Sequence, residues 1–452
     1  MHCLLLSFPA QGHISPMLQF SKLLKYQGVK VTLVTTFFFA KNLQKLPPSI
    51  TLETISDGFD NGGIGEAKNF KFYLDHFWQV GPQNLEKLIE KLGTTNCPID
   101  CVIYDSFYPW ALDVAKRFGI VGVAFLTQNI GIHSIYYHAY MGKLRVPLDV
   151  KENISLPMLP QLQYRDMPSF FHTYEKDPTF LHLCLDQFSN MDKADWILCN
   201  SFYELHQEVA DWTMNIWPNF RTIGPSIPSM FLDKRIKYDE DYGAPQFKSE
   251  EYCMEWLNDK PKGSVVYVSF GSLASLNEEQ IEEVACGLKD CENYFLWVVI
   301  PSQETKLPKY FEKKSQKGLV VTWCSQLKVL AHEAIGCFVT HCGWNSTLEA
   351  ISLGVPIVAM PQWSDQTTNA KFIVDVWKIG IRAPIDEKQI VRKDKLKDCI
   401  LEIMEGEKGK EIKNNATQWK SLAVRAFDEE GSSQKNIMEF VTSLFHLQAI
   451  DK

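Results

Sequence analysis

The chain has 452 residues, of which 45% are hydrophobic and 22% charged, a composition typical of a folded globular protein rather than a disordered one. Its formal net charge is −8, with 46 Lys and Arg against 54 Asp and Glu. This balance argues against a general polyanion-binding protein, so nucleic acid is not an expected partner. At roughly 150 residues per domain, the length predicts two or three domains.

Neither a membrane span nor a secretion signal is evident. No uninterrupted apolar run approaches the roughly 18 residues that a membrane-spanning helix needs, and the apolar start of the chain is too short and lacks the basic residues of a signal peptide. Twelve Cys are spread over the chain, and those that lie close in sequence, such as Cys97/Cys101 and Cys337/Cys342, form no C-x-x-C pair. Such usage indicates buried thiols in a reducing compartment. We therefore expect a cytoplasmic, monomeric protein without a membrane span.

Short apolar, β-branched segments alternate along the chain with longer segments of helical periodicity, a pattern typical of βαβ units and a parallel sheet. In the first half, the predicted strands are residues 3–8, 29–35, 101–104, 121–126 and 196–200. In the second half they are residues 265–270, 294–299, 319–322, 337–340 and 357–360, with helices predicted at 278–288 and 347–353. The sequence therefore predicts an α/β protein with two doubly wound parallel sheets.

Two further segments complete the predicted organisation. Residues 224–245 have little periodicity and are rich in charges and helix breakers, which predicts an interdomain linker. After Gly431, a last helix carries apolar residues on one face, namely Ile437, Phe440, Val441, Leu444 and Phe445. Such a face is expected to pack against a folded domain.

Ligands of open α/β sheets bind beyond the carboxyl ends of the strands, so the polar residues directly after each predicted strand are candidates. In the first half these are His13, Asp105, Thr127 and Gln128. In the second half they are Ser272 and the polar residues within 323–326, 341–346 and 363–366. If the two domains face one another, all of these residues line one cleft.

His13 is a candidate general base, because an unperturbed imidazole is largely neutral at pH 7 and available to accept a proton. A loop histidine that only caps or packs is an equally open interpretation. Asp105 is of interest as its partner, since a carboxylate bonded to one ring nitrogen fixes the tautomer and stabilises the imidazolium. Alone, Asp105 is more often the N-cap of the helix that begins near Trp110.

Ser346 and Glu349 have the spacing of a capping box at a helix start. The same helix follows Gly343 directly, and a helix N-terminus offers amide donors and a positive dipole end to a phosphate group. Asn345 and Ser346 add side-chain donors, and His341 would add a charge-assisted one. Both interpretations can hold together.

A zinc site is one interpretation of the residues Cys324, His332, Cys337, His341 and Cys342. It is disfavoured, because no C-x-x-C pair exists and strand alternation points His341 and Cys342 to opposite faces. The dinucleotide-binding, P-loop, serine-hydrolase and zincin motifs are absent from the sequence. These four enzyme classes therefore lose support.

Residues 323–366 closely resemble the 44-residue signature of plant secondary-product UDP-dependent glycosyltransferases of family 1, which have the GT-B fold of two Rossmann-like domains facing across a cleft. Residues 9–16, 104–110, 268–272 and 431–433 also resemble the corresponding family segments. The residues at 127–128 and 376–377 are most similar to those of the family group that acts on salicylate-like acids, auxins, steroids and triterpenoids.

The resemblance implies a role for each matching residue. Trp323 stacks on uracil, a contact worth roughly 1–3 kcal/mol; Cys324 meets the base through its backbone, and Gln326 and Glu349 hold the ribose. The diphosphate is bound by Ser272, His341, Asn345 and Ser346. The sugar hydroxyls are bound by Thr127, Trp344, Asp365 and Gln366, and a terminal Gln in this signature usually accompanies glucose.

His13 and Asp105 match the catalytic pair of the family, which implies an inverting transfer from UDP-glucose without a metal or other cofactor. The resemblance divides the chain into an acceptor-binding domain (1–238), a nucleotide-sugar-binding domain (239–430) and a C-terminal helix that returns to the first domain (431–452). We expect a hydrophobic small-molecule acceptor, because aromatic residues are frequent among the candidates for its pocket. These candidates are Phe8, Trp78, Phe107, Tyr136, Phe170, Phe171 and Trp363.

The leading hypothesis is thus an O-glucosyltransferase acting on a bulky hydrophobic alcohol or phenol. One alternative is glucose-ester formation on a small aromatic or auxin-like carboxylic acid, which is already ionised at pH 7 and needs little help from a base. An alternative of another class is a non-catalytic protein that binds a ligand on the same fold.

Overall fold

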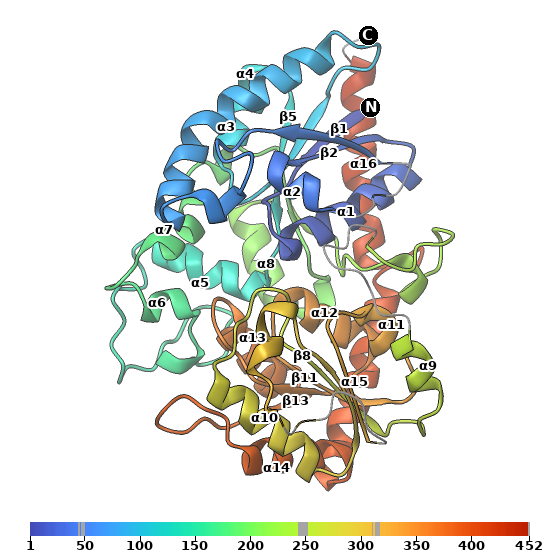
Figure 1. Ribbon diagram of the computed structural model, residues 1–452. Coiled ribbons are helices and arrows are strands. Elements are labelled where there is room, and N and C mark those ends of the chain that lie inside the picture. The colour runs from blue at the N-terminus through green and yellow to red at the C-terminus, as the bar shows by residue number, and fades with distance from the viewer. Residues whose placement is uncertain (44–45, 47–49, 243–251, 310, 312–316, 451–452) are drawn as a thin grey trace. The chain divides into compact units, whose positions relative to one another are not determined.

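The computed structural model describes residues 1–43, 46, 50–242, 252–309, 311 and 317–450, and it divides into two compact units (Figure 1). The first unit comprises Met1–Gln161, Phe170–Gln246 and Arg425–Lys452, and the second comprises Leu162–Ser169 and Phe247–Val424. Each unit is built around one wholly parallel sheet. The two Rossmann-like sheets confirm the predicted fold class.

The sheet of the first unit has seven strands in the order β3-β2-β1-β4-β5-β6-β7, so the order reverses between β1 and β4. The strands are β1 (His2–Leu6), β2 (Lys30–Thr36), β3 (Thr51–Ile55), β4 (Cys101–Asp105), β5 (Val121–Leu126), β6 (Trp196–Cys199) and β7 (Phe220–Thr222). Their helices are α1 (Gln11–Tyr26), α2 (Phe37–Asn42), α3 (Phe70–Gly93), α4 (Trp110–Arg117), α5 (Ile130–Tyr140), α6 (Ser169–His172), α7 (Thr179–Asp186), α8 (Gln207–Ile216) and α16 (Ser432–Ile450). Short helical turns are η1 (Gly63–Glu66), η3 (Met191–Lys193), η4 (Tyr203–Leu205) and η5 (Ser229–Phe231).

The sheet of the second unit has six strands in the order β10-β9-β8-β11-β12-β13, with the reversal between β8 and β11. The strands are β8 (Val265–Ser269), β9 (Tyr294–Val298), β10 (Gly318–Val321), β11 (Ile335–Thr340), β12 (Ile357–Ala359) and β13 (Gly380–Arg382). The helices are α9 (Tyr252–Asn258), α10 (Glu278–Asp290), α11 (Gln326–Leu330), α12 (Trp344–Leu353), α13 (Gln366–Lys371), α14 (Lys393–Met404) and α15 (Glu407–Arg425). Shorter turns are η2 (Tyr164–Asp166), η6 (Pro301–Lys306) and a π-helical turn, η7 (Phe372–Val376).

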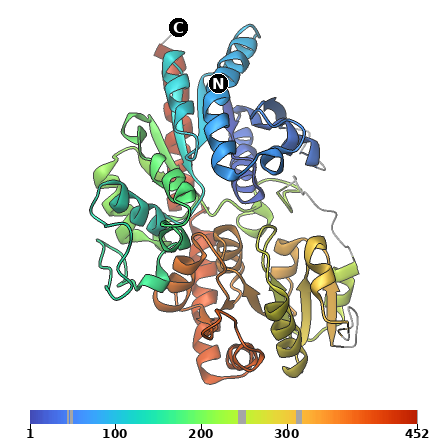
Figure 2. The ribbon, with the colours of Figure 1, turned by 60° about the vertical axis from the view of Figure 1, so that its left-hand side comes forward.

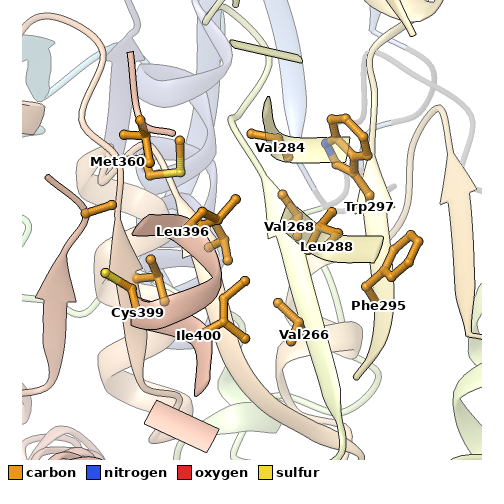
Figure 3. Close-up of a cluster of buried hydrophobic side chains, with 14 of the residues drawn as sticks. Val266, Val268, Val284, Leu288, Phe295, Trp297, Met360, Leu396, Cys399 and Ile400 are labelled. Carbon is orange, nitrogen blue, oxygen red and sulfur yellow. The ribbon is translucent and has the colours of Figure 1, made fainter. Parts of the chain in front are cut away.

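The core of the second unit shows why its strands form continuous apolar runs. On β8, Val266 and Val268 face α10 and α14 (Figure 3), while the alternate residue Tyr267 points to the other face and stacks on Phe338 at 4.9 Å between ring centroids. Both faces of the strand are therefore buried, as is usual in a parallel sheet covered by helices on both sides. Among the described strands of this sheet, the only charged side chain is Arg382, at the end of β13.

All ten predicted strands are present, with bounds within two residues of those expected. Three strands were missed, namely β3, β7 and β13, and each lies at an edge of its sheet. Their sequences, TLETI, FRT and GIR, are short or interrupted by charged residues. An edge strand is covered less completely than a central one, so it need not be continuously apolar and leaves a weaker sequence signal.

The predicted linker is held by the first unit over its described part. Asp239 is buried and accepts hydrogen bonds from Lys22 Nζ at 2.8 Å and Gln19 Nε2 at 2.7 Å, both on α1. Residues 229–239 are thus a folded part of this unit rather than an extended connection. The last predicted linker residues, 243–245, lie outside the described residues.

Helix α16 packs on the first unit, where Phe440 contacts Trp196 at 5.7 Å and Phe20 at 6.3 Å between ring centroids. In both views the red helix lies beside strands of this unit (Figures 1 and 2). Four of the five apolar residues of its predicted face are buried, but Phe445 is 40% exposed. At 100° per residue, Phe445 lies at the margin of the stripe formed by the other four.

The chain crosses between the units at a place that the sequence did not predict. Residues 162–169 were expected within the first domain, but they fold with the second unit, because Asp166 is buried there in an ion pair with Arg382.

Among the helices of the described residues, none is sufficiently long and apolar to cross a membrane.

Burial of His133 on α5 makes the stability of the protein depend on pH. Desolvation lowers the pKa of His133 to about 3, so the folded chain keeps this imidazole neutral while the unfolded chain protonates it below about pH 6.5. The free energy of unfolding should therefore fall as the pH decreases from 6.5 toward 3, by up to about 1.4 kcal/mol per pH unit from this group.

We expect His133→Gln to make this fall less steep between pH 6 and pH 4, measured by urea denaturation at several pH values. The matched control is His182→Gln, because His182 is exposed. Equal slopes for wild type and His133→Gln would contradict the expectation.

Candidate active site

His13 and Asp105 meet where the strand order of the first sheet reverses. His13 lies in the first turn of α1, directly after β1, and Asp105 is the last residue of the neighbouring strand β4. The distance between His13 Nδ1 and Asp105 Oδ2 is 2.7 Å. Crevices at such reversal points are the usual ligand sites of doubly wound sheets. The prediction that the two residues interact is therefore confirmed.

The surroundings of Asp105 fix the orientation of the imidazole. The carboxylate is fully buried, and its Oδ1 accepts a hydrogen bond from the Phe107 amide at 3.1 Å. The N-cap position of α4 is occupied by Pro109 instead, so the interpretation of Asp105 as a helix cap is wrong. Thr127 Oγ1, after β5, lies 3.2 Å from His13 Nδ1. With Nδ1–H donated to the carboxylate, Nε2 is the ring nitrogen that can receive a proton.

Two of the seven aromatic candidates for the acceptor pocket, Phe8 and Phe107, lie next to His13. The rings of Phe8 and Phe107 each lie 5.1 Å from the imidazole centroid and 5.7 Å from one another. Elsewhere in the first unit, Tyr136 stacks on Phe171 at 6.0 Å and Phe170 stacks on Phe180 at 5.0 Å. Trp78 is half-buried on α3, whereas Trp363 belongs to the second unit.

His341 occupies the equivalent reversal point in the second unit, after β11. A Cβ added at Gly343 would lie 2.5 Å from His341 Nε2, and one at Gly271 would lie 2.8 Å from it. Both glycines therefore leave space for the imidazole. Desolvation lowers the pKa of His341 to about 4. The side chain is thus neutral at pH 7, so a hydrogen bond from it to a diphosphate would be assisted by the charge of the acceptor alone.

Helix α12 begins earlier than the predicted capping box allows. Its first residue is Trp344 and its N-cap is Gly343, so Ser346 lies inside the first turn and the capping-box interpretation is wrong. Gln326 Nε2 donates instead to Ser346 Oγ at 2.9 Å and to Glu349 Oε2 at 2.7 Å. Three of the predicted nucleotide-binding residues thus form one hydrogen-bonded cluster beside the positive end of the helix dipole.

The other predicted nucleotide residues lie around this cluster. Cys324 is buried, with its Sγ 3.4 Å from the Tyr267 hydroxyl, which agrees with the expectation that only its backbone serves a ligand. Trp323 and Ser272 are partly exposed in the segments that follow β10 and β8. Trp344 is buried against Trp377 at 6.1 Å between ring centroids, so its backbone is the part that can reach a sugar.

Asn369 connects the two loops that carry the remaining candidates, and sequence reasoning missed it. Its Nδ2 donates to Asp365 Oδ2 at 2.9 Å and to the Cys342 carbonyl at 3.0 Å. Gln366 Oε1 accepts hydrogen bonds from the amides of Gln362 at 2.9 Å and Trp363 at 3.0 Å. The only available signal in the sequence was the position of an Asn three residues after the end of the 323–366 motif.

The zinc interpretation finds no support in the geometry. Within the described part of the chain, no group of three or more His, Cys, Asp or Glu side chains is placed to hold a metal ion.

Comparisons with known proteins identify relatives over nearly the whole chain. A family model of UDP-glucoronosyl and UDP-glucosyl transferase matches residues 234–422. Mogroside I-E synthase of Siraitia grosvenorii is 46% identical over 448 residues, covering 98% of each chain. The flavonol 7-O-beta-glucosyltransferase UGT74F1 of Arabidopsis thaliana is 44% identical over 451 residues, again covering 98% of each. The crystal structure of Os79 from O. sativa in complex with UDP is 37% identical, with a TM-score of 0.93 and coverage of 98% of this chain and 100% of that one.

The chain therefore belongs to the UDP-glucoronosyl and UDP-glucosyl transferase family and has the GT-B fold. It is an enzyme, a UDP-sugar glycosyltransferase of the plant type, and the resemblance inferred from residues 323–366 is confirmed. The alternative of a non-catalytic binding protein loses its support.

The space beside His341 gives a test of the nucleotide site. Gly343→Ala places a methyl group against the imidazole and should displace it, so we expect the Kd for UDP to rise roughly ten- to a hundredfold, equivalent to one lost hydrogen bond to a charged group. Isothermal titration calorimetry with UDP measures this change. Gly93→Ala is the matched control, because a Cβ at Gly93 meets nothing within 4 Å. An unchanged Kd in Gly343→Ala would contradict a phosphate contact from His341.

Proposed function

We propose that the protein transfers glucose from UDP-glucose to a hydroxyl group of a bulky hydrophobic small molecule of steroid, triterpenoid or flavonoid type, with inversion to a β-glucoside. The observation that carries this proposal is the 2.7 Å hydrogen bond between His13 and Asp105 at the carboxyl ends of β1 and β4. A histidine held by a buried carboxylate is suited to deprotonate a hydroxyl group.

The reaction is a single displacement at the anomeric carbon. His13 Nε2 takes the proton of the acceptor hydroxyl, and the oxygen forms a bond to the anomeric carbon on the face opposite UDP. The bond from this carbon to the diphosphate oxygen breaks, and UDP leaves with the electron pair. Asp105 stabilises the imidazolium that forms through its contact with Nδ1, and Thr127 Oγ1 lies 3.2 Å from the same Nδ1 atom. Such a base contributes on the order of 10²–10⁴ to the rate.

The second unit would bind the donor. Trp323 would stack on uracil and the cluster of Gln326, Ser346 and Glu349 would hold the ribose and part of the diphosphate. The leaving diphosphate would be stabilised by the N-terminus of α12 and by hydrogen-bond donors, so we propose a metal-independent reaction. Asp365 and Gln366 would bind the sugar hydroxyls, with Gln366 favouring glucose.

The acceptor class is supported by the rings of Phe8 and Phe107, which both lie 5.1 Å from His13 and contact one another. Apolar walls beside a base suit an acceptor that carries its hydroxyl on a large hydrophobic skeleton. The names of the relatives, a mogroside synthase and a flavonol glucosyltransferase, refer to acceptors of this general kind.

The proposal is tested with purified protein, UDP-glucose and a panel of steroids, triterpenoids, flavonoids and aromatic acids, by UDP release and product mass. We expect a gain of one hexose on hydroxylated acceptors, insensitivity to EDTA, and a β-configured product by NMR. His13→Ala should lower kcat by about 10²–10⁴, and Asp105→Asn should lower it by a large factor as well, because the amide no longer stabilises the imidazolium.

His182→Gln serves as the control, since His182 is an exposed histidine of the same unit. Turnover confined to carboxylic acids, with little loss in His13→Ala, would replace the proposal with glucose-ester formation. An α-configured product would overturn the single displacement.

A further inference from the structure

A segment of eight residues from the first half of the sequence folds with the second unit. This segment, Leu162–Ser169, is here called the strap; the chain belongs to the first unit immediately before it and immediately after it. Leu162 and Met167 are completely buried. The strap is therefore a firmly packed part of the second unit, although the linker between the halves of the chain comes about sixty residues later.

The strap is anchored by a buried carboxylate. Asp166 is 2% exposed, and its Oδ1 accepts a hydrogen bond from Arg382 Nη1 at 2.9 Å, while Lys371 Nζ lies 3.7 Å from Oδ2. Oδ2 also accepts the Gln163 amide at 3.0 Å, which closes the turn η2. A buried carboxylate is stable only when it is paired and hydrogen-bonded in this way.

Hydroxyl groups of α13 bind the backbone of the strap. Thr368 Oγ1 donates to the Asp166 carbonyl and Thr367 Oγ1 to the Met167 carbonyl, each at 2.6 Å. These threonines follow Gln366 directly in the sequence. The strap thus fixes the first turn of α13, which begins with Gln366, a predicted sugar-binding residue.

The strap also holds residues 363–366, the loop that leads into α13. The Ser364 amide donates to Ser169 Oγ at 2.6 Å, and the Ser169 amide donates to the Ser364 carbonyl at 2.8 Å. Ser364 has φ of 61°, a left-handed conformation that is unfavourable for a residue with a side chain by roughly 1–2 kcal/mol. The reciprocal pair of hydrogen bonds satisfies both backbone groups of the residue in this conformation.

We infer that the strap is a positioning element for the donor sugar, which holds residues 363–366 so that Asp365 and Gln366 meet the glucose hydroxyls. This inference rests on the proposed function, because the two residues are sugar contacts only in that reaction. The nucleotide cluster of Gln326, Ser346 and Glu349 lies on other elements. Loss of the strap should therefore weaken binding of the sugar and leave binding of UDP unchanged.

The test compares the Kd for UDP-glucose and for UDP in Ser169→Ala, which removes the acceptor of the Ser364 amide, and in Asp166→Asn, which removes the charge paired with Arg382. Both are measured by calorimetry without an acceptor substrate. We expect the Kd for UDP-glucose to rise about tenfold, since small displacements of positioning residues have effects of this order or larger. The Kd for UDP should change less than about twofold. The ratio of kcat/KM for UDP-glucose over UDP-galactose should fall in the same variants.

Arg165→Gln is the matched control, because the Arg165 side chain is exposed and the hydrogen bond that Arg165 accepts from Arg382 is made by its backbone carbonyl, which the substitution keeps. If Asp166→Asn fails to fold, Ser169→Ala alone decides. An equal loss of UDP and UDP-glucose binding, or no loss of either, would overturn the positioning role. Failure of the proposed function is distinguished by the wild type, which would then transfer no hexose while its nucleotide affinities still report on the strap.

Discussion

The parallel arrangement of both sheets determines where the chemistry of this protein lies. Strands such as β1, β4 and β8 are buried along their whole length, so they cannot carry polar side chains without partners. Because all strands of a sheet run in one direction, the polar residues that directly follow the strands lie along a single edge of the sheet. They lie closest together where the strand order reverses. His13 with Asp105, and His341 with Gly271, are the outcome of this one constraint in two separate sheets.

The features that follow from buried parallel strands could be predicted from the sequence, whereas features that depend on contacts between distant residues could not. The central strands and the polar residues after them follow from apolar runs, and the motif at 323–366 carries the family. The edge strand β13 is only three residues long, so no periodicity announces it. Asn369 and Asp166 act through contacts over 27 and 216 residues of sequence, and no local pattern encodes such a pairing. The neutral state of His341 depends on burial, which a motif does not reveal.

The two histidines at the reversal points are held by opposite means. His13 lies 2.7 Å from a buried carboxylate, which fixes the orientation of its ring. Around His341, two glycines admit the ring closely and the surrounding protein keeps it uncharged. Similar positions in two similar sheets therefore hold their histidines in different surroundings, one beside a buried carboxylate and the other beside two glycines.

The strap has a consequence for the construction of chimeras. An exchange of the first half of the chain between relatives, made at the linker in order to alter the acceptor, also transfers residues 162–169 onto a foreign α13 and β13. Asp166 and Arg382 then come from different parents, as do Ser169 and Ser364. A hybrid enzyme should therefore take its strap and its second unit from the same parent. Otherwise Thr367, Thr368 and Arg382 should be exchanged together with the strap, so that the contacts between them are kept while the rest of the first half is replaced.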